Sequence, residues 1–232
     1  FNIFRYSYLI FYKKRRRKTD IVLLILFVLV VLLQAGRNQM LAVLISPLFY
    51  YLKSVNFSAK KIFNLIIFSS FIFTVFLIFQ ELFYAIFDKT YIDFQAGKNN
   101  IRVLSASYYI FEHSPSIWNI LFGNGMFNGE SEYGDFIMNT LWSDYGFYAE
   151  DIGLIGFWSY FGIFTLVIYF YMLSIFFKNH NPLFFKMFAF YLILMSLATF
   201  DSYEPDSLIL QAILLYISDK YFNQKHHKKA HP

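Results

Sequence analysis

The chain has 232 residues, of which 58% are hydrophobic, 23% are aromatic and only 15% are charged. That is too little charge to cover the surface of a water-soluble domain of this size, and the mean hydropathy of +0.46 indicates the lipid bilayer as the main solvent. The net charge of +5 does not indicate a nucleic-acid partner, because its distribution follows the rules of membrane topology, and the absence of cysteine excludes disulfides.

Apolar runs of helical length follow one another along the chain and predict an all-α fold. The predicted architecture is a polytopic transmembrane helical bundle with one large extracytoplasmic loop. The predicted spans are 1–12, 19–35, 38–53, 62–86, 152–177, 183–200 and 206–218, and the loop is 87–151. Because the chain begins at Phe1, inside an apolar stretch, we expect it to be the C-terminal part of a longer protein with 1–12 as a truncated span.

The basic residues predict which ends of the spans face the cytoplasm, because cytoplasmic loops of membrane proteins are enriched in Lys and Arg. With Lys13–Lys18 placed inside, the C-terminus is also inside, and its basic tail is a further anchor to membrane lipid. The basic residues then left on the outer side are Arg37, Lys89, Lys98 and Arg102, while Arg5 lies in the truncated span. All acidic residues except Asp20 and Asp219 fall on the outer side.

The hairpin between Asp20 and Lys53 is short for two complete crossings of a bilayer. Two crossings of a hydrocarbon core of about 30 Å need about 40 residues, and only about 33 are available. We therefore expect the tip at Ala35–Asn38 to stop short of the outer surface, with Arg37 inside the membrane. An ionisable group there marks a candidate functional residue, and the alternative is a side chain that extends to the headgroups.

The predicted loop 87–151 is the only long polar segment, so we expect it to be folded and functional. Ser114 and Pro115 predict the N-cap and first turn of a short helix that ends at Gly123–Gly125. An earlier amphipathic helix, suited to the outer leaflet, is predicted by apolar residues at helical spacing, which are Ile101, Leu104, Tyr108 and Phe111.

Aromatic and acidic side chains are dense in this loop. The aromatic residues have two interpretations, an interfacial belt or a set of platforms for sugar rings, and the candidates for stacking are Trp118, Trp142 and Tyr148. Glu150 and Asp151 stand where the loop enters the bilayer, which makes them candidate proton acceptors or donors. Asp144 is a third candidate.

The motifs that mark nucleotide-dependent and metal-dependent enzymes are missing from the sequence. It has no Gly-rich phosphate loop, no Asp-x-Asp motif, no His-Glu-x-x-His motif and no Cys/His cluster. The sequence therefore predicts no metal site and no cofactor. His113, the one histidine of the loop, stands in a Glu-His-Ser-Pro turn, and we interpret it as structural.

Three segments carry a family resemblance. They are a hydrophobic hairpin with an arginine tip, LLQAGRNQMLAVLI at Leu32–Ile45; a loop arginine followed by a helix and a Gly-x-Gly turn, NNIRVLSASYYIFEHSPSIWNILFGNGMF at Asn99–Phe127; and an acidic residue before Gly-x-x-Gly, EDIGLIGFWSYFGIF at Glu150–Phe164. Together they resemble the O-antigen polymerase and O-antigen ligase superfamily of bacterial inner membranes, over roughly residues 20–220. The ligase branch has a histidine where this chain has Leu141–Asp144, so the polymerase branch is favoured.

The resemblance implies a membrane-embedded, metal-independent glycosyltransferase of the bacterial inner membrane. It would polymerise undecaprenyl-pyrophosphate-linked oligosaccharide repeats into O-antigen, capsule or exopolysaccharide, alongside other polysaccharide-assembly proteins. We expect Arg37 and Arg102 to bind the pyrophosphate, because a guanidinium donates paired hydrogen bonds to phosphate oxygens. Asp151, Glu150 and Asp144, in that order, are the candidate catalytic acids. The alternatives are an O-antigen ligase, a polysaccharide transporter or flippase, and a membrane-embedded acyltransferase.

Overall fold

A computed structural model describes residues 1–13, 17–33, 37–53, 70, 74, 77, 80–178, 181–199 and 209–220. These residues form helices and turns with no strand among them, so the predicted all-α fold class is confirmed. The helices in chain order are α1 (Asn2–Ser7) with a π-helical turn η1 (Tyr8–Tyr12), α2 (Lys18–Leu33), α3 (Arg37–Lys53), α5 (Gln80–Ala96), a 3-10 turn η2 (Gly97–Asn99), α6 (Ile101–Phe111), α7 (Ile117–Phe122), α8 (Glu132–Asp135), a π-helical segment η3 (Phe136–Asp144), a 3-10 turn η4 (Ala149–Ile152), α9 (Leu154–Phe176), α10 (Leu183–Ser196) and a last helix over 209–220.

α9 is the one described helix that is long and apolar enough to cross a membrane. It has 23 residues, whereas α2 and α3 have 16 and 17. At 1.5 Å per residue, α2 and α3 are about 25 Å long, which is shorter than a hydrocarbon core of about 30 Å. The described residues therefore show an all-helical fold with one helix of membrane-spanning length. That this chain crosses the membrane several times stays a prediction.

The start of the predicted loop differs in the structure. α5 runs without a break past residue 87 to Ala96, because the sequence offers no glycine or proline until Gly97, where φ is +51°. Most of the predicted span 62–86, the hairpin tip at 34–36 and the basic tail lie outside the described residues.

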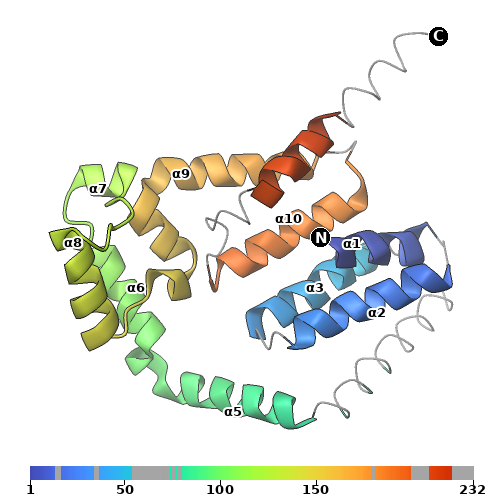
Figure 1. The fold of residues 1–232 in the computed structure, drawn as a ribbon, viewed down its shortest axis with the longest axis horizontal. Coiled ribbons are helices and arrows are strands. Elements are labelled where there is room, and N and C mark those ends of the chain that lie inside the picture. The colour runs from blue at the N-terminus through green and yellow to red at the C-terminus, as the bar shows by residue number, and fades with distance from the viewer. Residues whose placement is uncertain are drawn as a thin grey trace.

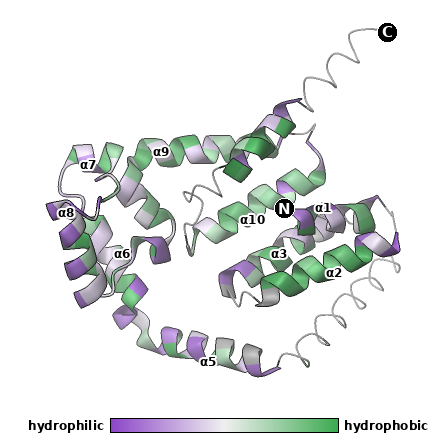
Figure 2. Ribbon diagram, in the orientation of Figure 1, coloured by the Kyte–Doolittle hydropathy of each residue, from purple (hydrophilic) through white to green (hydrophobic). Residues whose placement is uncertain are grey.

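The helices form two groups that α9 joins (Figure 1). In the first group α3 packs against α10, and α1 packs against α2 and α10. Of these helices, α2 and α10 are apolar along most of their length (Figure 2). In the second group α6, α7 and η4 pack against α9, and α8 is continuous with η3. Most of the polar segment that the sequence predicts to lie outside the membrane thus forms one end of the molecule.

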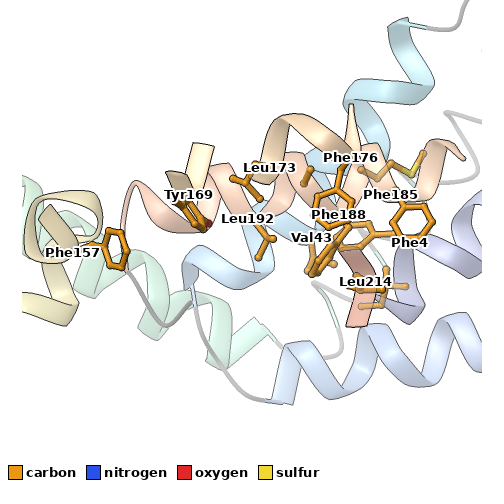
Figure 3. Close-up of a cluster of buried hydrophobic side chains, with 13 residues drawn as sticks. Phe4, Val43, Phe157, Tyr169, Leu173, Phe176, Phe185, Phe188, Leu192 and Leu214 are labelled. Atoms are coloured by element: carbon orange, nitrogen blue, oxygen red, sulfur yellow. The ribbon is translucent and has the colours of Figure 1, made fainter. Parts of the chain in front are cut away.

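The first group has an aromatic-rich core (Figure 3). Phe176 of α9 stacks on Phe185 of α10 with ring centroids 5.8 Å apart. Phe49 of α3 stacks on Phe190 of α10 at 4.7 Å. Such ring pairs contribute about 0.5–1.5 kcal/mol each beyond the area they bury, so they help to hold both α3 and α9 on α10.

A break divides α9 at Gly162, where φ is +75° and ψ is +174°. A break there turns the carbonyl groups of the preceding turn away from the regular helical hydrogen-bond pattern. A turn after α7 supplies donors for two of them. The backbone N–H of Asn124 donates to the carbonyl of Ser159 at 2.8 Å, and the N–H of Gly125 donates to the carbonyl of Tyr160 at 2.9 Å.

Two glycines allow this approach of backbone to backbone. A Cβ atom on Gly123 would overlap the carbonyl of Tyr160, and a Cβ atom on Gly162 would overlap the carbonyl of Leu121. Trp158 adds a third hydrogen bond between the two elements, because its indole N–H donates to the carbonyl of Ile120 at 3.0 Å. We refer to this contact between residues 120–125 and 158–162 as the α7–α9 junction.

Replacing Gly123 with alanine should destabilise the junction more than replacing Gly125. The two glycines have φ values of +82° and +81°, so both substitutions carry a similar backbone strain of about 1–3 kcal/mol. Only Gly123→Ala also places a methyl group on the backbone of Tyr160, since a Cβ on Gly125 meets nothing within 4 Å. Thermal unfolding of the two purified variants in detergent measures the difference, and equal unfolding temperatures would contradict the close approach.

Candidate functional site

The second group of helices has a small core of its own, which we call the loop core. Its buried members come from α6, η3, η4 and the first turns of α9, and they are Tyr109, Ile137, Leu141, Ala149, Ile152 and Tyr160. Two glycines of the Glu-Asp-x-Gly-x-x-Gly segment allow the backbone to pass closely. A Cβ atom on Gly156 would overlap the carbonyl of Ala149, and one on Gly153 would overlap the carbonyl of Ser196 at the end of α10.

The two helices predicted within the loop are both present, as α6 and α7. α6 begins after Asn100, whose side chain accepts a hydrogen bond from the backbone N–H of Arg102 at 2.9 Å. The N-cap of α7 is Ser116 and not the predicted Ser114, because the hydroxyl of Ser116 reaches the backbone N–H of Asn119 at 3.2 Å. Ser114 is buried instead and accepts a hydrogen bond from the Asn124 side chain at 3.2 Å.

His113 is buried among tyrosines. Its Nε2 lies 3.0 Å from the hydroxyl of Tyr133, its ring stacks with that of Tyr133, and the edge of Tyr109 meets it at a centroid distance of 4.9 Å. Burial lowers the pKa of His113 below its ordinary value and raises the pKa of Tyr133 to about 12. These contacts connect the end of α6 with α8, in agreement with a structural role for His113.

Glu150 lies at the edge of the loop core, half-buried, next to Tyr109. Burial, and then the negative charge of Glu150, raise the pKa of the Tyr109 hydroxyl. That hydroxyl donates to the carbonyl of Phe147 at 3.4 Å and also interacts with Tyr160. The other two candidate acids are exposed, Asp151 beside Glu150 in η4 and Asp144 at the end of η3.

Two of the three predicted stacking aromatics are neighbours. The ring of Trp142 lies 5.5 Å from that of Tyr148 and 4.9 Å from that of Phe127. Tyr148 is 43% exposed, and the indole N–H of Trp142 has no hydrogen-bond partner among the described residues. Trp118 stands on α7 instead, 67% exposed, with its ring stacked on that of Phe122.

The two predicted arginines are on different groups of helices. Arg102 is half-buried in the first turn of α6, and α6 packs against η4, which carries Glu150 and Asp151. Arg37 is the first residue of α3, and its side chain lies outside the described part of the structure. The structure thus brings one arginine and two of the candidate acids onto neighbouring elements.

Sequence reasoning did not single out Tyr109, Tyr133 and Tyr160 as site residues. They are three of 19 tyrosines, and only the tertiary packing of α8, η4 and α9 around α6 brings them to His113 and Glu150. Across the residues that the structure describes, no group of three or more His, Cys, Asp or Glu side chains could hold a metal ion. No protein-family profile, no curated protein and no solved structure matches the chain.

The buried His113 should make the loop core less stable in acid. Its folded-state pKa lies below the unfolded value of 6.5, so the unfolded chain binds more protons as the pH falls. The free energy of unfolding is therefore unaffected by His113 above pH 6.5. Below that pH it falls, by at most about 1.4 kcal/mol per pH unit for one proton. Near-UV circular dichroism during unfolding in detergent, between pH 8 and pH 5, measures this slope.

Two variants assign that slope to the histidine. His113→Phe removes the titrating group and should flatten the pH dependence. Tyr133→Phe removes the same hydrogen bond but leaves the imidazole in place, so its slope should remain. A slope that persists in His113→Phe would show that another group is responsible.

Proposed function

We propose that this chain belongs to a multi-pass membrane glycosyltransferase that polymerises undecaprenyl-pyrophosphate-linked oligosaccharide repeats at the outer face of the bacterial inner membrane. The observation that carries the proposal is the packing of α6, which carries Arg102, against η4, which carries Glu150 and Asp151. Both elements also pack against α9, the described helix of membrane-spanning length. The resemblance of three sequence segments to O-antigen polymerases supports the same reaction.

Exposed apolar side chains support the embedding in a membrane. Large apolar residues of α2, α3, α9 and the helix over 209–220 remain exposed. Five of them are 53–61% exposed, namely Val22, Leu41, Val167, Ile168 and Ile209. α2 carries apolar residues on its exposed side, and other apolar residues of α2 pack against the core of the first group. A helix that is apolar on all sides is typical of a membrane or a large protein core.

The directions of the helices support the predicted topology. The charge pattern assigns the start of α2, the end of α3, the end of α9 and the start of α10 to the cytoplasm. In Figure 1 these four ends lie toward the right of the view, and the group of α6, α7 and α8 lies at the left. One plane could therefore pass through all four helices with the group of α6, α7 and α8 on one side of it.

The chemistry needs a cation for the diphosphate and a base for the acceptor. In the proposed reaction a sugar hydroxyl attacks the anomeric carbon of the lipid-linked donor, and the bond from that carbon to the diphosphate oxygen breaks. Arg102 would hold the leaving diphosphate, and Glu150 or Asp151 would take the hydroxyl proton. Trp142 and Tyr148 offer adjoining rings on which a sugar could stack, next to η4.

A ligase reaction would use the same groups with a different acceptor. The break in α9 is also a feature of transporters, in which broken helices expose backbone carbonyls that bind ions. Here the carbonyls of Ser159 and Tyr160 already accept hydrogen bonds from Asn124 and Gly125. They are therefore not free to coordinate an ion, which favours a structural role for this break.

Neutralising the acids of η4 should shorten the polysaccharide. General-base catalysis contributes about 10²–10⁴-fold to a rate, so Glu150→Gln or Asp151→Asn should remove most of the long-chain ladder in a host that lacks the wild-type gene. Glu130→Gln is the matched control, because Glu130 is an exposed carboxylate of the same loop that is not assigned to the site. A wild-type ladder from both η4 variants would remove the carboxylates from the mechanism.

Replacing Arg102 with lysine should separate charge from geometry. Arg102→Lys keeps the positive charge but loses the paired hydrogen bonds of the guanidinium, so we expect partial activity, and Arg102→Ala should be inactive. Lys98→Ala, at an exposed residue of η2, serves as the control. Full activity of Arg102→Lys would contradict paired binding of the diphosphate.

Gel electrophoresis of the surface polysaccharide from the strain that lacks the gene separates the proposed function from its alternatives. Single repeats on the final acceptor indicate a polymerase, and complete polymer left on the lipid carrier indicates a ligase. Repeats held on the cytoplasmic side indicate a flippase, and an unchanged pattern would overturn the glycan hypothesis.

A further inference from the structure

One side of α7 is apolar and exposed. Ile117 is 60% exposed, Trp118 67% and Phe122 59%. The rings of Trp118 and Phe122 stack at a centroid distance of 6.0 Å, and Phe122 meets Phe164 of α9 at 5.4 Å. The row of rings therefore continues from α7 onto α9 just beyond its break.

On α9 this surface continues along the helix. Phe164 is 50% exposed, Val167 61% and Ile168 57%. No charged residue occurs in α7 or in α9. The exposed surface of α7 is thus continuous with that of the one described helix whose length and composition suit a membrane.

The polar side chains of the same segment are turned toward the protein. Asn119 donates from Nδ2 to Oδ1 of Asn124 at 2.7 Å, and the hydroxyl of Ser116 donates to Oδ1 of Asn119. Nδ2 of Asn124 donates to the hydroxyl of Ser114 at 3.2 Å and to the carbonyl of Ser159 at 3.0 Å. These serines and asparagines therefore form a closed network beneath the helix, with Ser114 buried.

The backbone at the end of α7 is paired as well. The N–H of Gly123 donates to the carbonyl of Asn119 at 2.8 Å, and the next two N–H groups donate to carbonyls of α9. The carbonyl of Ile120 accepts from Trp158. A segment in water would direct its asparagines outward and its tryptophan inward, whereas a segment in hydrocarbon must pair its polar groups internally. Residues 114–125 follow the second pattern.

We propose that residues 114–125 are seated in the outer leaflet of the bilayer, with Ile117, Trp118 and Phe122 against lipid acyl chains. The part of α9 after the break, Ile163–Phe176, is about 21 Å long at 1.5 Å per residue, less than the hydrocarbon core of about 30 Å. α7 lies at its broken end and extends the apolar surface toward the outer face. The inference rests on the membrane embedding in the proposed function, and it assigns Trp118 to lipid rather than to a sugar ring.

Site-directed spin labelling tests this placement. The label is attached at Trp118→Cys in the full protein, reconstituted in phosphatidylethanolamine and phosphatidylglycerol vesicles, and its collisions with oxygen and with a water-soluble nickel chelate are measured. Ile117→Cys is a second reporter in case the first variant does not fold. The chain described here contains no other cysteine that could take the label.

We expect frequent collisions with oxygen and loss of collisions with nickel, as for lipid-facing sites. Frequent nickel collisions would place α7 in water, and few collisions with either reagent would mean that protein covers it; both results would overturn the proposal. Ile168→Cys on α9 is the membrane control and Asp144→Cys the water control. If the label on Ile168→Cys also met nickel, the membrane embedding itself would fail, which separates the two hypotheses.

Discussion

The packing of the second group of helices on α9 depends on the pairing of two backbone segments at the α7–α9 junction. The break at Gly162 takes the carbonyls of Ser159 and Tyr160 out of their helical pattern, and the turn after α7 supplies N–H groups for both. A buried carbonyl without a partner costs about 1–3 kcal/mol, so α9 can bend at this position only while the turn is docked. The docked turn also holds Tyr160 in the loop core, where it meets Tyr109 beside Glu150.

The glycine-containing segment after Glu150 therefore has a structural explanation that is independent of any reaction. Gly153 admits the end of α10, Gly156 admits η4, and Gly162 admits the backbone before Gly123. These contacts place the polar unit at a defined position on the apolar helices and direct η4 to the surface beside α6. In the proposed enzyme, the glycines position the acidic residues, and the acidic residues act on the substrate.

The parts of this structure that depend on local sequence could be predicted. Apolar runs marked α2, α3, α9 and α10, and apolar residues at helical spacing marked α6. The break in α9 could not be predicted, because a glycine in an apolar helix serves equally as a packing site, and only the docked turn makes Gly162 adopt a positive φ. Likewise Ser114 and Ser116 both suit an N-cap, and burial of Ser114 beneath Asn124 decides between them. The meeting of Glu150 with Tyr109 depends on η3 and η4 folding back onto α6, which no local pattern indicates.

The junction also constrains the order in which the chain can be assembled. The donors at Asn124 and Gly125 precede the acceptors at Ser159 and Tyr160 in the sequence, so they leave the ribosome first. In the proposed membrane topology, residues 120–125 would already be outside the cytoplasm when α9 enters the bilayer. A straight α9 would keep its carbonyls paired and could insert alone, which makes the bent form a product of the meeting with α7. In that topology, synthesis from the N- to the C-terminus suits this fold, because a permuted chain that made α9 before α7 would have to bend a helix that is already in lipid.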